Sequence, residues 1–293
     1  MASIRPIDAA GSTRFILTAT ANSAQGQVAA ISEFIDRYVG YIVEFDQFDD
    51  VNENRFFARV LFGVDPDVDS EALTASFAEV ADRFDMRWSL KPVDARPRVL
   101  LMVSKTDHCL RDLLYRHERG ELAMDITAIA SNHRDLKPLA DAYGFRFVHL
   151  PVTADTRAEQ EAALWQLIED TDTELVVLAR YMQILSDDLS RKLRGWAINI
   201  HHSFLPGFKG AKPYRQAFVR GVKLIGATAH YVTTDLDEGP IIEQTVARVD
   251  HADSVSDLVA KGRDCECHTL ARALALHLDG RVFLNGDRTV VLE

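Results

Sequence analysis

Residues 174–200, ELVVLARYMQILSDDLSRKLRGWAINI, contain two short apolar runs separated by a more polar stretch. The runs are ELVVLA at 174–179 and WAINI at 196–200, and both have the length of strands. Neither run alternates apolar with polar residues, which is typical of strands that are buried on both faces of a sheet. The segment therefore predicts two strands of a covered, parallel sheet.

Further apolar runs precede this segment and extend the pattern. They are VLLMVS at 99–104, MDITAIAS at 124–131 and FRFVHL at 145–150. Helical patterns lie between the runs, such as the one from Thr156 to Glu169. Strands that alternate with helices predict an α/β fold with a Rossmann-like, mostly parallel sheet flanked by helices. Binding sites in such sheets form at the carboxyl ends of the strands.

The first 90 residues follow a different order. Strand patterns occur at 14–20, 41–48, 54–63 and 86–91, and helical patterns occur at 25–40 and 73–84. The order βαββαβ predicts a ferredoxin-like domain. Its two helices cover one face of the sheet, so the apolar residues of 41–48 and 55–62 need a partner on the other face. We therefore expect a homo-oligomer held partly through residues 14–90.

The segment LKPVDARPRV at 90–99 separates the two patterns. It contains two prolines and alternating charges, which is typical of a short solvated linker. We therefore expect an N-terminal domain at 1–90, a linker at 91–98 and a second domain at 99–293.

Composition limits the partners of the chain. The formal net charge of −11 argues against general binding to nucleic acid or to a membrane surface. We find no apolar stretch of the ~18 to 20 residues that span a bilayer and no apolar signal core at the N-terminus, so we expect a cytoplasmic protein. The motif CECH at 265–268 lies in a helical pattern, where residues two apart do not face each other. That spacing disfavours a metal site.

Two polar groups follow predicted strands in the second half of the chain. Asn199 and His201 come at the end of WAINI, and His230 precedes an acidic loop that contains Asp235 and Asp237. Such residues also serve as caps and turns, so a structural role is an alternative for each group. Together, however, a carboxamide, an imidazole and a carboxylate are a set that can perform acyl chemistry.

The stretch NIHHSFLPGFKGAKPYRQAFVRGVKLIGATAHYVTTDLDEGPIIEQ at 199–244 resembles the signature of folate-dependent formyltransferases, and the resemblance extends over 98–293. It implies that Asn199, His201 and Asp237 are catalytic. The segment VVLARYMQILS at 176–186 is similar to the folate-pocket segment of that family. The implied substrate-binding residues are Met182, Gln183, Ile184, Leu185, His202, His230 and Asp235. A helix start packed on the sheet is the alternative for the first four of these.

The resemblance is to the hydrolytic members of the family in three respects. The motif HHSFLP at 201–206 has a second histidine where ribonucleotide formyltransferases have proline, and SKTDHCLRDLLYR at 104–116 lacks their glycine-rich phosphate loop. We also expect the chain to lack the additional domain of the tRNA-directed relatives, since the sequence stops at Glu293. These features imply hydrolysis of 10-formyltetrahydrofolate to formate and tetrahydrofolate, which would supply one-carbon and purine metabolism. No metal or redox cofactor is implied.

Two other functions share these residues. One is formyl transfer to a non-phosphorylated amine, because only the acceptor would differ. The other is a regulatory protein that binds folate without turnover. Formation of formate, with and without candidate amines, separates the three hypotheses.

The first 90 residues resemble an ACT domain, which implies a small effector such as an amino acid. The family carries an acidic residue and a Gly-Leu pair at the first strand-to-helix turn. Here Asn22 and Ser23 replace the acidic residue, Gly26 is kept, and Gln27 replaces the leucine. Whether this domain binds an effector therefore stays open.

Position alone predicts less about the other polar residues near the motif. His202 follows His201 in an extended segment, so its ring is expected on the opposite side. There it would either close the acceptor entrance or satisfy local backbone groups. Lys209, Lys212 and Arg215 would either hold the glutamate tail of a folate or lie in solvent.

Overall fold

The structure is a computed structural model and describes residues 11–205 and 213–293. It divides into two compact units, which we describe separately. The first unit contains Met1–Ala95, Asp279–Asn285 and Val290–Glu293, and the second contains Arg96–Leu278 and Gly286–Thr289. The junction at residues 95 and 96 falls inside the linker expected from the sequence.

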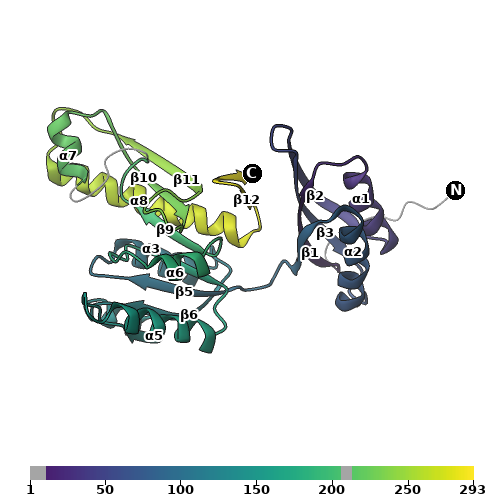
Figure 1. The fold of residues 1–293 in the computed structure, drawn as a ribbon, viewed down its shortest axis with the longest axis horizontal. Helices are drawn as coiled ribbons and strands as arrows, with labels where there is room; N and C mark the ends of the chain where they lie inside the picture. The colour runs from purple at the N-terminus through teal and green to yellow at the C-terminus, as the bar shows by residue number, and fades with distance from the viewer. Residues whose placement is uncertain (1–10, 206–212) are drawn as a thin grey trace. The chain divides into compact units, whose positions relative to one another are not determined.

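The first unit has an antiparallel sheet and two helices in the order βαββαβ, as predicted (Figure 1). Across the sheet the strands are β2 (Tyr41–Asp50), β3 (Arg55–Val64), β1 (Thr13–Asn22) and β4 (Arg87–Pro92). The helices are α1 (Gln27–Arg37) and α2 (Ser70–Phe84). Alternate residues of β3, such as Phe56 and Phe62, belong to the core that also includes Phe34 and Phe77 of the helices. The periodicity of β3 thus fixes the face that the helices cover.

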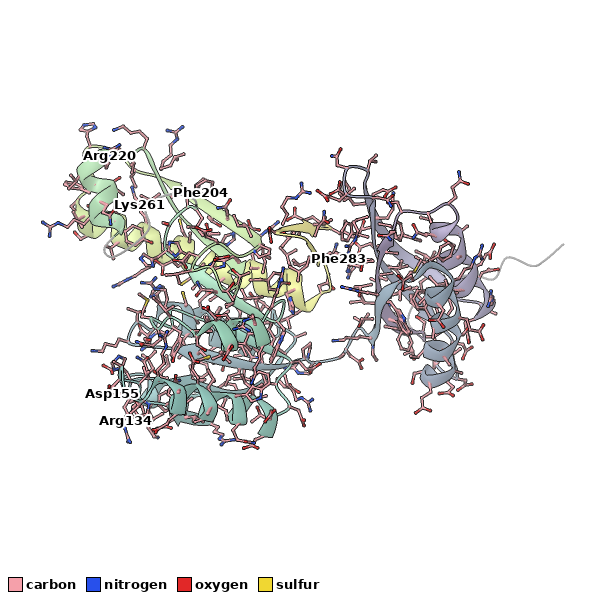
Figure 2. The ribbon with its side chains drawn as sticks, in the orientation of Figure 1. Arg134, Asp155, Phe204, Arg220, Lys261 and Phe283 are labelled. Carbon is pink, nitrogen blue, oxygen red and sulfur yellow. The ribbon has the colours of Figure 1, made fainter. Side chains whose placement is uncertain are left out.

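The opposite face of β3 is covered in part by the C-terminal segment of the same chain. This segment contains the strands β12 (Val282–Asn285) and β13 (Arg288–Val291). Phe283 (Figure 2) packs edge-on against Phe57, with 5.8 Å between the ring centroids. Arg59 is 1% exposed and donates hydrogen bonds to the backbone oxygen and the carboxylate of Asp279.

These contacts differ from the sequence-based expectation in two ways. The range 99–293 was expected to form one domain, but residues 279–285 and 290–293 group with the first unit. The physical reason is that Phe57 and Arg59 on β3 need cover, and the chain itself supplies it. The need for a partner copy on this face is correspondingly smaller.

The second unit is built on a seven-stranded sheet, and its predicted mostly parallel character is confirmed. The parallel strands, in order, are β9 (Ala197–His201), β8 (Leu175–Leu178), β5 (Arg98–Val103), β6 (Asp125–Ser131) and β7 (Phe147–His149). The antiparallel strands β10 (Leu224–Tyr231) and β11 (Ile241–Arg248) extend the sheet beyond β9. The helices are α3 (His108–Glu118), α4 (Lys137–Ala142), α5 (Arg157–Asp170), α6 (Asp187–Lys192), α7 (Pro213–Arg220) and α8 (Val255–Leu278).

The register of the central strands determines where the site lies. Leu178 at the end of β8 is paired with Asn199 on β9, so the segments that follow these two strands emerge side by side. On the other side of β9, His230 of β10 lies directly opposite Asn199. Three stretches that are distant in sequence therefore meet near the carboxyl ends of β8 and β9.

The long helix α8 packs against β9, β10, β11 and α3. It is the longest helix of the described chain, yet it carries charged residues along its length. Within residues 11–205 and 213–293, none of the helices combines the length and the apolar character that a membrane crossing requires.

Candidate active site

A cavity of about 240 Å³ opens at the carboxyl ends of β8 and β9. The ten residues that the resemblance implied to be catalytic or substrate-binding all line this cavity. They are Asn199, His201, Asp237, Met182, Gln183, Ile184, Leu185, His202, His230 and Asp235. The structure therefore brings together the motif at the strand end, the acidic loop and the segment after β8.

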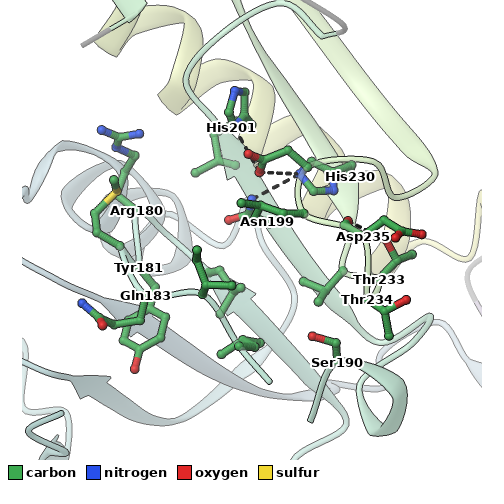
Figure 3. A pocket seen from close by; sticks show the side chains of 18 of the residues that line it. Arg180, Tyr181, Gln183, Ser190, Asn199, His201, His230, Thr233, Thr234 and Asp235 are labelled. Atoms are coloured by element: carbon green, nitrogen blue, oxygen red, sulfur yellow. Dashed lines mark hydrogen bonds and ion pairs between the residues drawn. The ribbon is translucent and has the colours of Figure 1, made fainter. Parts of the chain in front are cut away.

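The carboxamide of Asn199 has its orientation fixed by His230 (Figure 3). His230 is buried, and its Nδ1 lies 2.9 Å from the backbone oxygen of Tyr231, which can only accept a hydrogen bond. In neutral His230 the proton is therefore on Nδ1, and Nε2 accepts a hydrogen bond from Nδ2 of Asn199 at 3.2 Å. This network assigns the amide nitrogen of Asn199. One N–H of Asn199 remains for a ligand.

His201 and Asp237 form a pair at the centre of the cavity lining. Nδ1 of His201 lies 3.1 Å from Oδ1 of Asp237, and the imidazole is 6% exposed. Nε2 of His201 is buried and has no hydrogen-bond partner among the described residues. A buried, unsatisfied ring nitrogen is costly, so it marks the atom to which a ligand would bind.

Asp237 is held as an anion. Burial acts to raise the pKa of its carboxyl group, but the contact with the His201 imidazole outweighs burial and holds that pKa well below its usual range. Nε2 of His230 lies 3.8 Å from the same Oδ1 atom. Asp235, two residues earlier, is exposed at the rim, so the two aspartates of the loop have different surroundings.

The loop that carries Asp237 is closed tightly at its base. The backbone N–H of Tyr231 donates to the backbone oxygen of Pro240 at 2.9 Å. A Cβ atom on Gly239 would lie 1.7 Å from the backbone oxygen of Tyr231, so only glycine allows this approach. Asp237 itself has φ of 58°, an uncommon backbone conformation for a residue with a side chain.

The segment after β8 is anchored to the sheet rather than to a helix. The backbone N–H of Met182 donates to Oγ of Ser104 at 2.9 Å, and Ser104 in turn donates to Asn132. α6 begins only at Asp187, so the alternative of a helix start at 182–185 is wrong. Met182 and Ile184 are more than half exposed, as expected for apolar side chains that await a ligand.

The expected position of His202 is wrong. Its ring stacks on that of His201, with 5.1 Å between centroids and 23° between planes. β9 ends at His201, so the alternation of a strand no longer applies to the next residue. Burial, followed by the charge of Arg180 and the neighbouring His201, lowers the pKa of His202 to about 4. Its imidazole is therefore neutral near pH 7.

Sequence reasoning missed several residues of the cavity. Arg180, Tyr181, Ser190, Thr233 and Thr234 also line it, together with the apolar Leu178, Ile200, Val232 and Leu236. The signal for Arg180 was its place within two residues of the end of a predicted parallel strand. Arg215 is exposed on α7 and is not part of the lining, whereas Lys209 and Lys212 lie outside the described residues.

Residues 97–274 match the formyl transferase family, and the chain belongs to that family. It is 52% identical over 282 residues to the formyltetrahydrofolate deformylase of Corynebacterium sp. (strain P-1), across 96% of this chain and 98% of the relative. The crystal structure of the formyltetrahydrofolate deformylase from Burkholderia mallei ATCC 23344 is similar with a TM-score of 0.93 and 56% identity, across 96% of this chain and 100% of that chain.

A solved transferase structure is similar over less of the chain. The glycinamide ribonucleotide transformylase 1 from Symbiobacterium toebii gives a TM-score of 0.63 at 30% identity, across 68% of this chain and 95% of that chain. The similarity to the two deformylases thus extends over nearly the whole chain, whereas the transferase has no counterpart for about a third of it.

Proposed function

We propose that this chain is a formyltetrahydrofolate deformylase, which hydrolyses 10-formyltetrahydrofolate to formate and tetrahydrofolate. One observation carries the proposal. The buried, unpaired Nε2 of His201 lies in a cavity with an oriented Asn199 amide and the ionised Asp237. Similarity to deformylases over nearly the full length supports water as the acceptor.

The formyl carbonyl lies between Asn199 and His201 in the proposed complex. The remaining N–H of Asn199 and the Nε2–H of protonated His201 donate to the carbonyl oxygen. These donors strengthen as negative charge develops on that oxygen, which stabilises the tetrahedral intermediate. The contact with Asp237 supports the proton on His201.

Water supplies the nucleophile. Its oxygen attacks the formyl carbon while the Asp237 carboxylate accepts its proton. When the intermediate collapses, the bond between the formyl carbon and N10 breaks, and N10 takes up the proton that water released. The products are formate and tetrahydrofolate. Because Asn199 and His201 polarise the carbonyl, the proposed mechanism does not require a metal or a redox cofactor.

Folate binds along the segment after β8. Backbone groups and apolar side chains of 182–185 receive the pterin, and Asp235 lies on the facing wall. His230 acts on substrate through Asn199, because its two ring nitrogens already contact Asn199 and Tyr231. The anchoring of Met182 to Ser104 keeps this wall in place before substrate arrives.

The purified protein, mixed with 10-formyltetrahydrofolate, should release formate and tetrahydrofolate in equal amounts. The reaction is then repeated with glycinamide ribonucleotide and with simple amines. A formylated amine detected by mass spectrometry, at a rate comparable with formate release, would replace the hydrolase by the alternative formyltransferase. Tight folate binding without any formate would favour the regulatory alternative.

The proposal extends to the surroundings of the enzyme. The first unit acts in regulation and in assembly of a homo-oligomer, and its effector would be a small amino acid if it binds one. Exposed apolar residues of β2, namely Ile42, Val43 and Phe48, support a contact with a second copy. We expect a cytoplasmic protein without nucleic-acid or membrane partners, in line with its net charge of −11.

A further inference from the structure

Glu266 of α8 is a carboxylate with 1% exposure in the interior of the second unit. Its Oε2 lies 2.8 Å from Nε2 of His108, and its Oε1 accepts a hydrogen bond from the hydroxyl of Tyr214 at 2.7 Å. Nε of Arg180 lies 3.2 Å from Oε2, as an ion pair that lacks the alignment of a hydrogen bond. One buried anion therefore joins α3, α7 and the segment after β8.

The helix is shaped to admit these partners. Gly262 lies one turn before Glu266, and a Cβ atom there would be 2.1 Å from the ring of Tyr214. Glycine inside a helix costs roughly 1 kcal/mol relative to alanine. Here it opens the space through which Tyr214 reaches the carboxylate.

A metal ion is the first alternative for this cluster, since potential ligand atoms of His108, Cys109 and Glu266 lie within 4.8 Å of one another. Three contacts already occupy the carboxylate, and the Arg180 cation would repel a second cation. A hydrogen bond with Cys267 and burial raise the pKa of the Cys109 thiol well above its usual value. A neutral thiol is a poor ligand, so the geometry favours a network of protein groups alone.

The network continues from Arg180 to the active site. Nη1 of Arg180 contacts Nδ1 of His202, and a guanidinium group can only donate hydrogen bonds. Nδ1 of His202 is therefore the acceptor, and the ring proton of the neutral imidazole is on Nε2. The same ring stacks on that of His201, and Nδ1 of His201 contacts Asp237.

We propose that Arg180, held in place by Glu266, is a positioning residue that keeps His202 a neutral acceptor, so that His201 alone of the stacked pair carries the catalytic proton. The inference rests on the function proposed above. A second cationic imidazole beside His201 would oppose its protonation and weaken the donor to the oxyanion. By accepting from Arg180 at Nδ1, His202 is kept from becoming that cation.

Several charged or titratable groups surround the stacked rings of His201 and His202. The sum of their charges decides whether a proton on these rings is favoured or opposed. Arg180 follows β8, Glu266 is on α8, and Asp237 is in the loop after β10. The remaining groups are Tyr214 of α7, whose ring centroid is 6.4 Å from that of His202, His108 of α3, which contacts Glu266, and His230, which contacts Asp237. In this set Glu266 offsets the charge of Arg180, so the pair that contacts His202 through Arg180 has no net charge.

The test is the pH dependence of kcat for formate release in two charge-changing variants. The proposed mechanism uses a proton on Nε2 of His201, so formate release should fall at high pH. Glu266→Gln leaves Arg180 uncompensated, which should move this fall about one pH unit lower. Arg180→Gln removes the cation and should move it about one unit higher, with a new loss of activity on the acid side as His202 gains a proton.

Controls separate this effect from damage to the fold. The double variant Arg180→Gln/Glu266→Gln removes both charges and should return the fall to within a few tenths of a unit of its original position. Lys261 lies on α8, as Glu266 does (Figure 2), and Lys261→Met removes its surface ion pair with Asp253, which should leave the profile unchanged. Thermal unfolding of each variant shows whether the protein is folded where kcat is measured.

A second measurement does not depend on turnover. Nitrogen-15 NMR of the histidine rings, with His202→Gln to assign the signal, should show His202 protonated on Nε2 alone near pH 7. Shifts of both charge variants in the same direction, or no shift while the parent protein releases formate, would overturn the proposal. If the parent releases no formate, the proposed function fails, and the NMR result then decides whether Arg180 fixes the His202 tautomer. A proton on Nδ1 would overturn that too.

Discussion

The two units each contain a buried charge network, and the networks are organised differently. In the first unit Arg59 is buried, while the side chains of Glu44 and Asp279 that pair with it are 35% and 42% exposed. In the second unit Glu266 and Arg180 are both largely buried, at 2% and 14% exposure. The first network fastens a chain segment to a sheet, whereas the second ends at a reactive imidazole. In the network that reaches the active site both charged partners are buried, whereas in the first unit only Arg59 is buried.

The largest expected effect is a loss of activity in the second unit without a change in its fold. Asp237→Asn keeps the shape of the side chain but removes the proton acceptor. Formate release should fall by at least ~10²-fold, within the usual range for loss of a general base. Stopped assays of formate and titration of folate binding by fluorescence measure the two effects. Turnover close to that of the parent would reduce Asp237 to a pterin contact.

The next largest effect tests how much the Arg59 network stabilises the first unit. Arg59→Met removes the hydrogen bonds to Asp279 and should lower the free energy of unfolding by about 2 kcal/mol, as for hydrogen bonds to charged groups. Trp88 reports this unit in urea titrations if Trp165 and Trp196 are replaced by Phe. Arg59→Lys keeps the charge but loses the planar fork, so its effect should be smaller. An unchanged midpoint would mean that the hydrogen bonds from Arg59 to Asp279 contribute nothing to stability.

A smaller effect is expected from the group that orients Asn199. His230→Phe removes the acceptor for the amide, and kcat should fall by roughly 10-fold because the carbonyl donor is no longer aligned. His230→Gln is the matched variant, since its side-chain oxygen can take the place of Nε2. The glutamine variant should lose less activity than the phenylalanine variant. Equal losses would show that orientation of Asn199 is not the cause.

The smallest effect concerns stability in acid. The pKa of Asp237 is lowered by folding, so its contribution to stability is present above the unfolded value of ~3.9 and is lost as pH falls towards the folded value. Asp237→Asn should therefore flatten the fall in melting temperature below about pH 4. Melting curves between about pH 2 and 5 measure this. Parallel curves for the two proteins would contradict the contact between Asp237 and His201.

Local patterns were enough to predict most of the fold. Strands such as 174–179 and 196–200 are visible because their apolar runs are contiguous in sequence. The positions of Asn199 and His201 at a strand end and of Asp237 in a short loop were visible for the same reason, whereas their proposed catalytic role came from the resemblance to folate-dependent formyltransferases. Each of these features depends on residues within about ten positions of one another.

Features set by distant contacts could not be predicted in the same way. Glu266 lies between the two cysteines of CECH, yet its partners are 158, 86 and 52 positions away in the sequence. The stacking of His202 depends on where β9 ends, and the cover of Phe57 comes from the last residues of the chain. None of these contacts leaves a periodic trace in the sequence.

The closed base of the loop between Tyr231 and Pro240 has a consequence for chain length. The two ends of the loop are fixed by a hydrogen bond, and Gly239 lies against the strand. The number of residues between the ends therefore determines whether Asp237 lies opposite His201. One inserted residue would shift the carboxylate by up to about 3.8 Å, beyond hydrogen-bond reach, at little cost in loop entropy. Transplanted or redesigned loops at this position must therefore keep their residue count before their composition matters.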